Sequence, residues 1–132
     1  MDGAVNGHEY LYTTVVPVLL GEGVPAGRVA REIHLRHEII SHWFGHRRGM
    51  RLWGCARYHR LPHPVEEMSD SLLLQILLDF ASEQSGLLVL YPCSSEAASF
   101  AARKAEALES RFVILPIPKT GDPLSCIVLK ND

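Results

Sequence analysis

Residues 15–37 have the sequence VVPVLLGEGVPAGRVAREIHLRH, and this stretch decides the fold class. Residues 15–20 form a short, continuous apolar run, which is typical of a parallel strand buried on both faces. The run ends at Gly21 and Gly23, which predict a tight turn. Over residues 25–37 the apolar positions recur at three- and four-residue spacing, as in a helix. The stretch therefore predicts a strand that passes through a glycine turn directly into a helix.

A similar pattern returns at residues 87–91, which have the sequence LLVLY. The small polar turn Pro92-Cys93-Ser94-Ser95 follows, and the hydroxyl of Ser94 or Ser95 can cap a helix over residues 96–108. The other predicted elements are a strand at 38–44, a loop with one short strand at 47–64, a helix at 72–83 capped by Ser69 or Asp70, a strand at 112–115 and an apolar run at 126–129.

Strands and helices that alternate in this way indicate right-handed crossover units on one sheet. We predict a single α/β domain over residues 1–132, a three-layer Rossmann-like fold with a mostly parallel sheet of four or five strands. Residues 1–14 are expected to be a tail, and residues 119–132 a tail or an edge strand. Ligands bind such sheets at the carboxyl ends of the strands, where the strand order reverses. The candidate ligand-binding residues at these ends are Gly21, Glu22, Gly23, Cys93, Ser94, Ser95 and Glu96. For the glycine turn, a tight turn without a ligand is the favoured interpretation, and the two serines are helix caps first.

Two segments carry a resemblance to a known family. They are residues 17–34, PVLLGEGVPAGRVAREIH, and residues 87–118, LLVLYPCSSEAASFAARKAEALESRFVILPIP. Together they resemble the amino-terminal, Rossmann-like domain that precedes the ATP-grasp fold in carboxylate–amine ligase-like proteins. The resemblance covers residues 15–118, which is nearly the whole chain.

Particular residues match the family pattern. The helix after its glycine turn has an Ala-Arg pair, which corresponds here to Ala30-Arg31, and its Phe-led strand ends in Leu-Pro, as residues 112–116 do. The acidic residue after the family's second turn corresponds loosely to Glu96. Residues 47–64 match nothing in the family pattern.

The resemblance implies that the parent protein is an ATP-dependent ligase. In the family the ATP site, with its paired lysines and its acidic and Asn ligands for magnesium, lies in a following ATP-grasp domain that this sequence lacks. We therefore expect neither ATP chemistry nor a cofactor in this chain, and the implied partners are that domain and a small-molecule acceptor substrate. The chain is then an excised lobe or a natural stand-alone relative. Two other functions stay open, namely a stand-alone module for a small ligand or nucleotide, and a non-catalytic interaction domain that forms a homodimer.

Composition argues against several other classes of protein. The 132 residues include 13 Lys and Arg against 15 Asp and Glu, a net charge of −2, which gives no general attraction for nucleic acid or anionic lipid. No apolar stretch reaches the ~20 residues of a membrane span, and the start MDGAVNGHEY lacks the pattern of a signal peptide. We expect a cytoplasmic protein that binds neither nucleic acid nor membrane.

Residues with reactive side chains also have structural interpretations. Cys93 lies between a strand and a helix, where a thiol can become a nucleophile, but no partnering base is evident and a small turn residue is the favoured interpretation. His42 and His46 are four residues apart on a predicted strand and its exit, where this spacing does not converge. His59 and His63 have the same spacing around Pro62, so no metal site is predicted. No catalytic residue is assigned.

An arginine-rich segment precedes the second half of the chain. It either binds a phosphate or acidic partner or forms a solvated face, and the second interpretation is favoured. The arginines are Arg47, Arg48, Arg51, Arg57 and Arg60. The three cysteines, Cys55, Cys93 and Cys126, are far apart, so no disulfide is predicted either.

Overall fold

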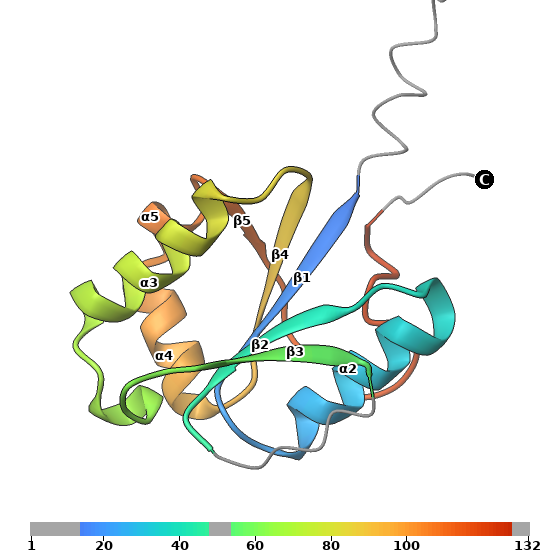
Figure 1. Ribbon diagram of the computed structural model, residues 1–132, viewed down its shortest axis with the longest axis horizontal. Coiled ribbons are helices and arrows are strands. Elements are labelled where there is room, and N and C mark those ends of the chain that lie inside the picture. Colours follow the sequence, from blue (N-terminus) through green and yellow to red (C-terminus); the bar gives the residue numbers. More distant parts are fainter. Residues whose placement is uncertain (1–13, 48–53, 128–132) are drawn as a thin grey trace, which may run out of the picture.

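A five-stranded parallel sheet forms the centre of the protein (Figure 1). The computed structural model describes residues 14–47 and 54–127. The strands are β1 (Val15–Leu20), β2 (Ser41–Gly45), β3 (Ala56–Arg60), β4 (Leu87–Pro92) and β5 (Phe112–Ile114). Their order is β3-β2-β1-β4-β5, and every neighbouring pair is parallel. The predicted α/β, three-layer Rossmann-like fold is confirmed.

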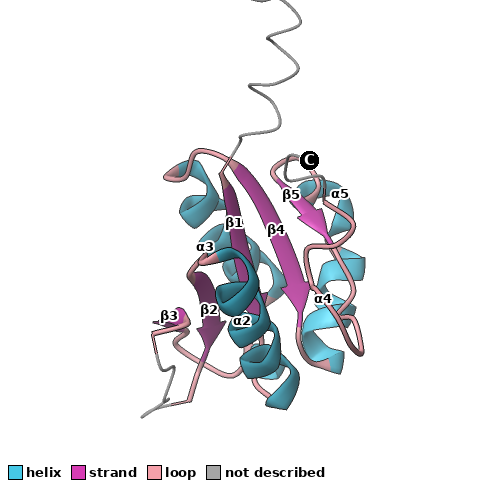
Figure 2. Ribbon diagram, turned by 90° about the vertical axis from the view of Figure 1, so that its right-hand side faces the viewer, coloured by secondary structure: helices cyan, strands magenta, loops and turns pink. Residues whose placement is uncertain are grey.

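Both faces of the sheet are covered, but by different kinds of segment (Figure 2). One face packs against α3 (Asp70–Ser82), α4 (Ser95–Arg103) and α5 (Ala105–Leu108), and the short 3-10 helix η1 (Val65–Glu67) leads into α3. The other face packs against α2 (Val24–His37) and the non-helical residues 115–127. No helix in the described part of the chain is long and apolar enough to cross a bilayer.

β1, the strand at the start of residues 15–37, lies in the middle of the sheet. All six residues of β1 are buried, and they contribute alternately to the cores on the two faces of the sheet. Because both faces are covered, the strand needs apolar residues at successive positions rather than at alternate ones. The continuous run VVPVLL is explained by this central position.

Serine side chains cap two helices as expected. Ser69 Oγ accepts a hydrogen bond from the backbone N–H of Leu72 at 3.2 Å, and Ser94 Oγ accepts one from Ala97 at 3.1 Å. Each serine satisfies one of the backbone donors that a helix start leaves unpaired. The capping residues are therefore Ser69 rather than Asp70, and Ser94 rather than Ser95.

Some predicted boundaries differ from the structure. The strand predicted at 38–44 begins at Ser41, because Glu38 has φ 59° and ends α2 in the left-handed conformation, where its N–H donates to the His34 carbonyl. The helix predicted at 96–108 is divided at Lys104, whose backbone leaves helical values at φ −113° and ψ 24°. No glycine or proline marks this break in the sequence.

The strand expected within 47–64 is β3, which begins at Ala56. The apolar run predicted at 126–129 is not a strand in its described part. Cys126 and Ile127 lie in a turn, and the Ile127 N–H donates to the Leu124 carbonyl at 2.9 Å. Val128 and Leu129 lie outside the described residues.

Candidate functional site

The two predicted turns lie side by side at the carboxyl edge of the sheet. β1 pairs with β2 on one side and with β4 on the other. The helix that follows β1, α2, and the helix that follows β4, α4, cover opposite faces of the sheet. The Cys93 N–H donates to the Leu20 carbonyl at 2.8 Å, and the Gly21 N–H donates to the Phe44 carbonyl at 2.9 Å. This is the point where the strand order reverses, which is where ligands bind in such sheets.

Gly21 is in close contact with the start of α4. A Cβ atom at Gly21 would lie 2.8 Å from Ser94 Oγ and 3.4 Å from Ala97 Cβ, so a larger residue would displace the capping serine. The Ser94 hydroxyl already accepts the Ala97 N–H. Ser94 therefore joins the turn after β1 to the first turn of α4.

Gly23 is the N-cap of α2 and has φ 134°, a conformation that favours glycine. No side chain caps this helix, and a Cβ at Gly23 would lie 3.6 Å from the Cys93 carbonyl oxygen. The amino ends of α2 and α4 thus meet at one junction, which we name the switch crevice and define by Gly21–Gly23 and Pro92–Ser94. The Ala97 N–H is bonded to Ser94 Oγ and the Ala26 N–H to the Gly23 carbonyl at 3.2 Å, so it is the positive ends of the two helix dipoles that favour an anionic group at this position.

The Glu22 carboxylate is directed to the carboxyl ends of β2 and β3. Its Oε2 accepts hydrogen bonds from the His46 N–H, from the Arg47 N–H at 3.1 Å and from the Tyr58 hydroxyl at 2.9 Å. Gly45 makes this possible, because a Cβ there would overlap Glu22 Oε2 and lie 2.6 Å from the Tyr58 oxygen. We call these five residues the Glu22 network.

Two further features describe this network. Burial, together with the hydrogen bond to Glu22, raises the pKa of the Tyr58 hydroxyl well above its ordinary value, so Tyr58 remains a donor. The other carboxylate oxygen, Glu22 Oε1, is buried and accepts no hydrogen bond from the described residues. Glu22 thus links three strand ends and keeps one oxygen without a partner.

Cys93 contributes its backbone rather than its thiol. The side chain is 6% exposed and belongs to the core beneath α2, where its S–H donates to the Tyr91 carbonyl at 3.3 Å. Burial raises the pKa of the Cys93 thiol to about 12, which opposes formation of a thiolate. The interpretation as a small turn residue agrees with this environment.

Ser95 and Glu96 line a separate polar hollow of about 310 Å³ between η1 and α4. Arg103 also lines it and forms a two-pronged ion pair with Asp70 at 2.8 and 2.9 Å. The candidate ligand-binding residues therefore divide between the switch crevice, the Glu22 network and this hollow.

Sequence reasoning missed a histidine pair. His42 Nδ1 lies 2.9 Å from His59 Nε2, and the His59 ring stacks on Phe44 with centroids 4.5 Å apart. Burial is the main reason that the pKa of each imidazole is lowered. β2 pairs with β3 in a parallel register that places Phe44 opposite His59, so the two histidines lie on one face of the sheet. Local sequence patterns do not reveal this register, and the pair was therefore missed.

His46 does not join that pair, because its Nδ1 lies 2.9 Å from the Leu61 carbonyl oxygen. In the described ranges 14–47 and 54–127, no three His, Cys, Asp or Glu side chains are grouped to hold a metal ion. Of the arginine-rich segment, Arg60 donates to the His46 carbonyl at 3.2 Å, whereas Arg48 and Arg51 lie outside the described residues.

The arrangement suits recognition of a small polar ligand. The positive ends of the α2 and α4 dipoles favour an anionic group at the switch crevice, and the nearby Glu22 network adds a carboxylate oxygen that can accept from a donor. No family model matches this chain, and no curated protein or solved structure matches it either.

Proposed function

We propose that this chain is the amino-terminal lobe of an ATP-grasp ligase-like protein and contributes contacts to the acceptor substrate. The observation that best supports the proposal is the switch crevice, where the turn after β1 and the turn after β4 meet between two helix amino termini. These are the same two turns on which the family resemblance depends. The lobe acts in the cytoplasm in this proposal.

The lobe binds and orients substrate, and the ATP chemistry belongs to the separate ATP-grasp domain. The family resemblance assigns the paired lysines and the magnesium ligands to that separate domain. Backbone N–H groups of the crevice bind an acidic group of the acceptor. The Glu22 carboxylate repels a second anion and favours an acceptor that carries a hydrogen-bond donor.

The reading frame beyond codon 132 provides the most direct test. An ATP-grasp domain in that region supports the lobe assignment. A frame that continues into an unrelated domain, or that stops there, contradicts the lobe assignment. That result would favour the alternative function, a stand-alone ligand-binding module.

Binding at the crevice can be tested independently on the chain itself. Amide NMR titration with a panel of amino acids and small dicarboxylates is expected to shift the signals of Gly21, Gly23 and Ser94. Gly23→Ala should weaken this binding, because the added methyl faces the Cys93 carbonyl in the crevice. Gly121→Ala is a matched control, since Gly121 also has positive φ, at 88°, but lies in open space.

Two results would count against the crevice. One is a set of shifts confined to the opposite edge of the sheet. The other is equal weakening of binding by Gly23→Ala and Gly121→Ala, which would mean that backbone strain rather than the crevice controls affinity.

A further inference from the structure

The α2 face of the sheet has an open strip above β2 and β3. The crossovers β1–β2, β3–β4 and β4–β5 each contain a helix, but the connection from β2 to β3 is only ten residues long, 46–55, and its described part contains no helix. Parallel strands are usually joined by a dozen or more residues that include a helix. Among the described residues, α2 packs over this part of the sheet.

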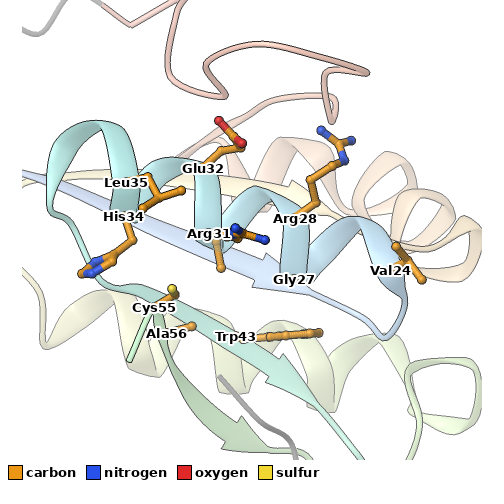
Figure 3. Close-up of a pocket in the computed structure, with 11 residues that line it drawn as sticks. Val24, Gly27, Arg28, Arg31, Glu32, His34, Leu35, Trp43, Cys55 and Ala56 are labelled. Atoms are coloured by element: carbon orange, nitrogen blue, oxygen red, sulfur yellow. The ribbon is translucent and has the colours of Figure 1, made fainter. Parts of the chain in front are cut away.

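A groove of about 890 Å³ follows this strip (Figure 3). Its sheet side includes Trp43, Cys55 and Ala56, and its other wall is the length of α2. Val24 and Leu35, at the two ends of the helical wall, are 85% and 63% exposed, the largest values among the exposed large hydrophobic side chains. The groove is mostly apolar and its volume lies within the range of small-molecule sites, roughly 300–1,000 Å³.

Gly27 keeps the groove open in its middle. Glycine is the least favourable residue inside a helix apart from proline, so its presence in α2 needs a reason. Packing does not supply one, because a Cβ at Gly27 would meet only Trp43 Cη2, at an ordinary distance of 4.0 Å. The missing side chain instead leaves space above the edge of the Trp43 ring.

Four polar side chains line the groove, namely Arg28, Arg31, Glu32 and His34, and the Glu32 carboxylate is paired with Arg36. Arg28 and Arg36 have partners, the Pro118 carbonyl and Glu32, whereas Arg31 is exposed and makes no hydrogen bond or ion pair with any described residue. His34 Nδ1 is buried and likewise has no hydrogen-bond partner in the described part. Both side chains line the groove (Figure 3).

We propose that this groove binds an organic anion with a flat apolar body. The body lies over Gly27 and against Trp43 and Ala56, and the acidic group binds the Arg31 guanidinium, with His34 Nδ1 available for a hydrogen bond. An unpartnered guanidinium beside an apolar surface suits such a ligand, because it binds carboxylates and sulfonates strongly and stacks on flat rings. This site is separate from the switch crevice and does not depend on the proposed function.

Other occupants fit less well. A second copy packed face to face on this groove would bring two α2 helices together. Each helix carries three arginines and one glutamate, so the two helices would repel each other. A stable protein interface also buries about 800 Å² on each partner, which a groove with two strongly exposed hydrophobic side chains does not offer.

The experiment uses 8-anilinonaphthalene-1-sulfonate, an aromatic anion, and its uncharged analogue N-phenyl-1-naphthylamine. Fluorescence titration of the folded chain is expected to show one saturable site for the anion. The uncharged analogue should bind about tenfold more weakly, because it lacks the charge-assisted contact with Arg31. Arg31→Ala should abolish that preference, and Arg36→Ala, on the same helix but paired with Glu32, is the matched control.

A second variant tests the shape of the groove without removing charge. Gly27→Leu is expected to reduce anion affinity at least tenfold, as the new side chain fills the space above Trp43, while far-UV circular dichroism and the melting temperature stay at or above wild-type values. Amide shifts on binding should cluster in residues 27–35 and at Ala56.

Three results would overturn the inference. They are unchanged binding by a folded Gly27→Leu protein, shifts confined to the switch crevice, and a dimer in sedimentation experiments that excludes the probe until it is diluted. The last result would identify a second copy of the chain as the occupant.

Discussion

The two faces of the sheet differ in how completely they are covered. Leu77 of α3 and Val29 and Ile33 of α2 are all fully buried, so each face has a closed core. The α2 face also carries Val24 and Leu35, which are mostly in solvent. Residues 115–127 cover part of the α2 face, and polar contacts attach them, including His37 Nε2 at 2.9 Å from Asp122. Both faces therefore stabilise the fold through packing, and the α2 face also leaves apolar surface for recognition.

The largest effect expected from this difference is on stability. Leu77→Ala should lower the free energy of unfolding by about 2–5 kcal/mol, because it leaves a cavity in the closed core. Leu35→Ala, on the open face, should change it by no more than about 0.5 kcal/mol. Urea unfolding of both variants measures the contrast, and similar losses would show that the Leu35 side chain packs more closely than its exposure indicates.

The switch crevice shows how far sequence reasoning could locate a site. Two continuous apolar runs, one followed by a glycine turn and the other by the polar turn Pro92-Cys93-Ser94-Ser95, were enough to predict two strand ends at one edge, because parallel strands in such folds share their direction. Side-chain directions were harder to obtain. Nothing local indicates that Glu22 reaches across to Tyr58, since that contact depends on the order of β1, β2 and β3 and on the space at Gly45.

The Glu22 network should respond to a single added methyl group. Gly45→Ala places a Cβ against Glu22 Oε2 and the Tyr58 hydroxyl, and we expect a loss of about 1–3 kcal/mol of stability from this overpacking. In a Glu22→Ala background the same change should cost less, because the carboxylate that it overlaps is gone. A double-mutant cycle in urea measures the coupling, and additive losses would mean that the network does not account for Gly45.

The closed face should also carry a pH dependence. Burial lowers the pKa of His42 and His59 in the folded state, whereas both titrate near their ordinary value of about 6.5 when the chain is unfolded. As the pH falls through about 6.5, the unfolded chain takes up protons that the folded chain excludes, so stability decreases towards acid pH. The slope from these residues is at most about 1.4 kcal/mol per pH unit for each proton taken up.

Urea unfolding between about pH 7.5 and about pH 5.5 measures this slope. A double variant, His42→Phe with His59→Phe, keeps aromatic rings beside Phe44 and Phe80 but removes both titrating groups. Its stability should depend less on pH than that of the wild type over this range. An equal slope in the two proteins would assign the pH dependence to other residues.

Two further features could not be predicted from the sequence, namely the histidine pair and the helix break at Lys104. His42 and His59 are 17 residues apart, so no local spacing could join them, and only the β2–β3 register does so. Lys104 is an ordinary helix-forming residue, and the break there depends on how α4 and α5 pack on the sheet. Local patterns thus predicted the element types and the serine caps of α3 and α4, while the strand pairings depended on tertiary packing.

The smallest expected effect is a gain in stability on the open face. Gly27→Ala adds a methyl that meets only Trp43 Cη2 at 4.0 Å, so it introduces no overlap. Alanine is favoured over glycine within a helix by roughly 0.5–1 kcal/mol, and the variant should be more stable by an amount in this range.

Thermal unfolding measures the change. The control is the reverse substitution one residue earlier, Ala26→Gly, for which a larger loss of stability is expected because Ala26 is fully buried. A decrease in melting temperature for Gly27→Ala would mean that the helix and the sheet approach each other too closely for a methyl group, and that the groove above β2 is narrower than its lining residues indicate.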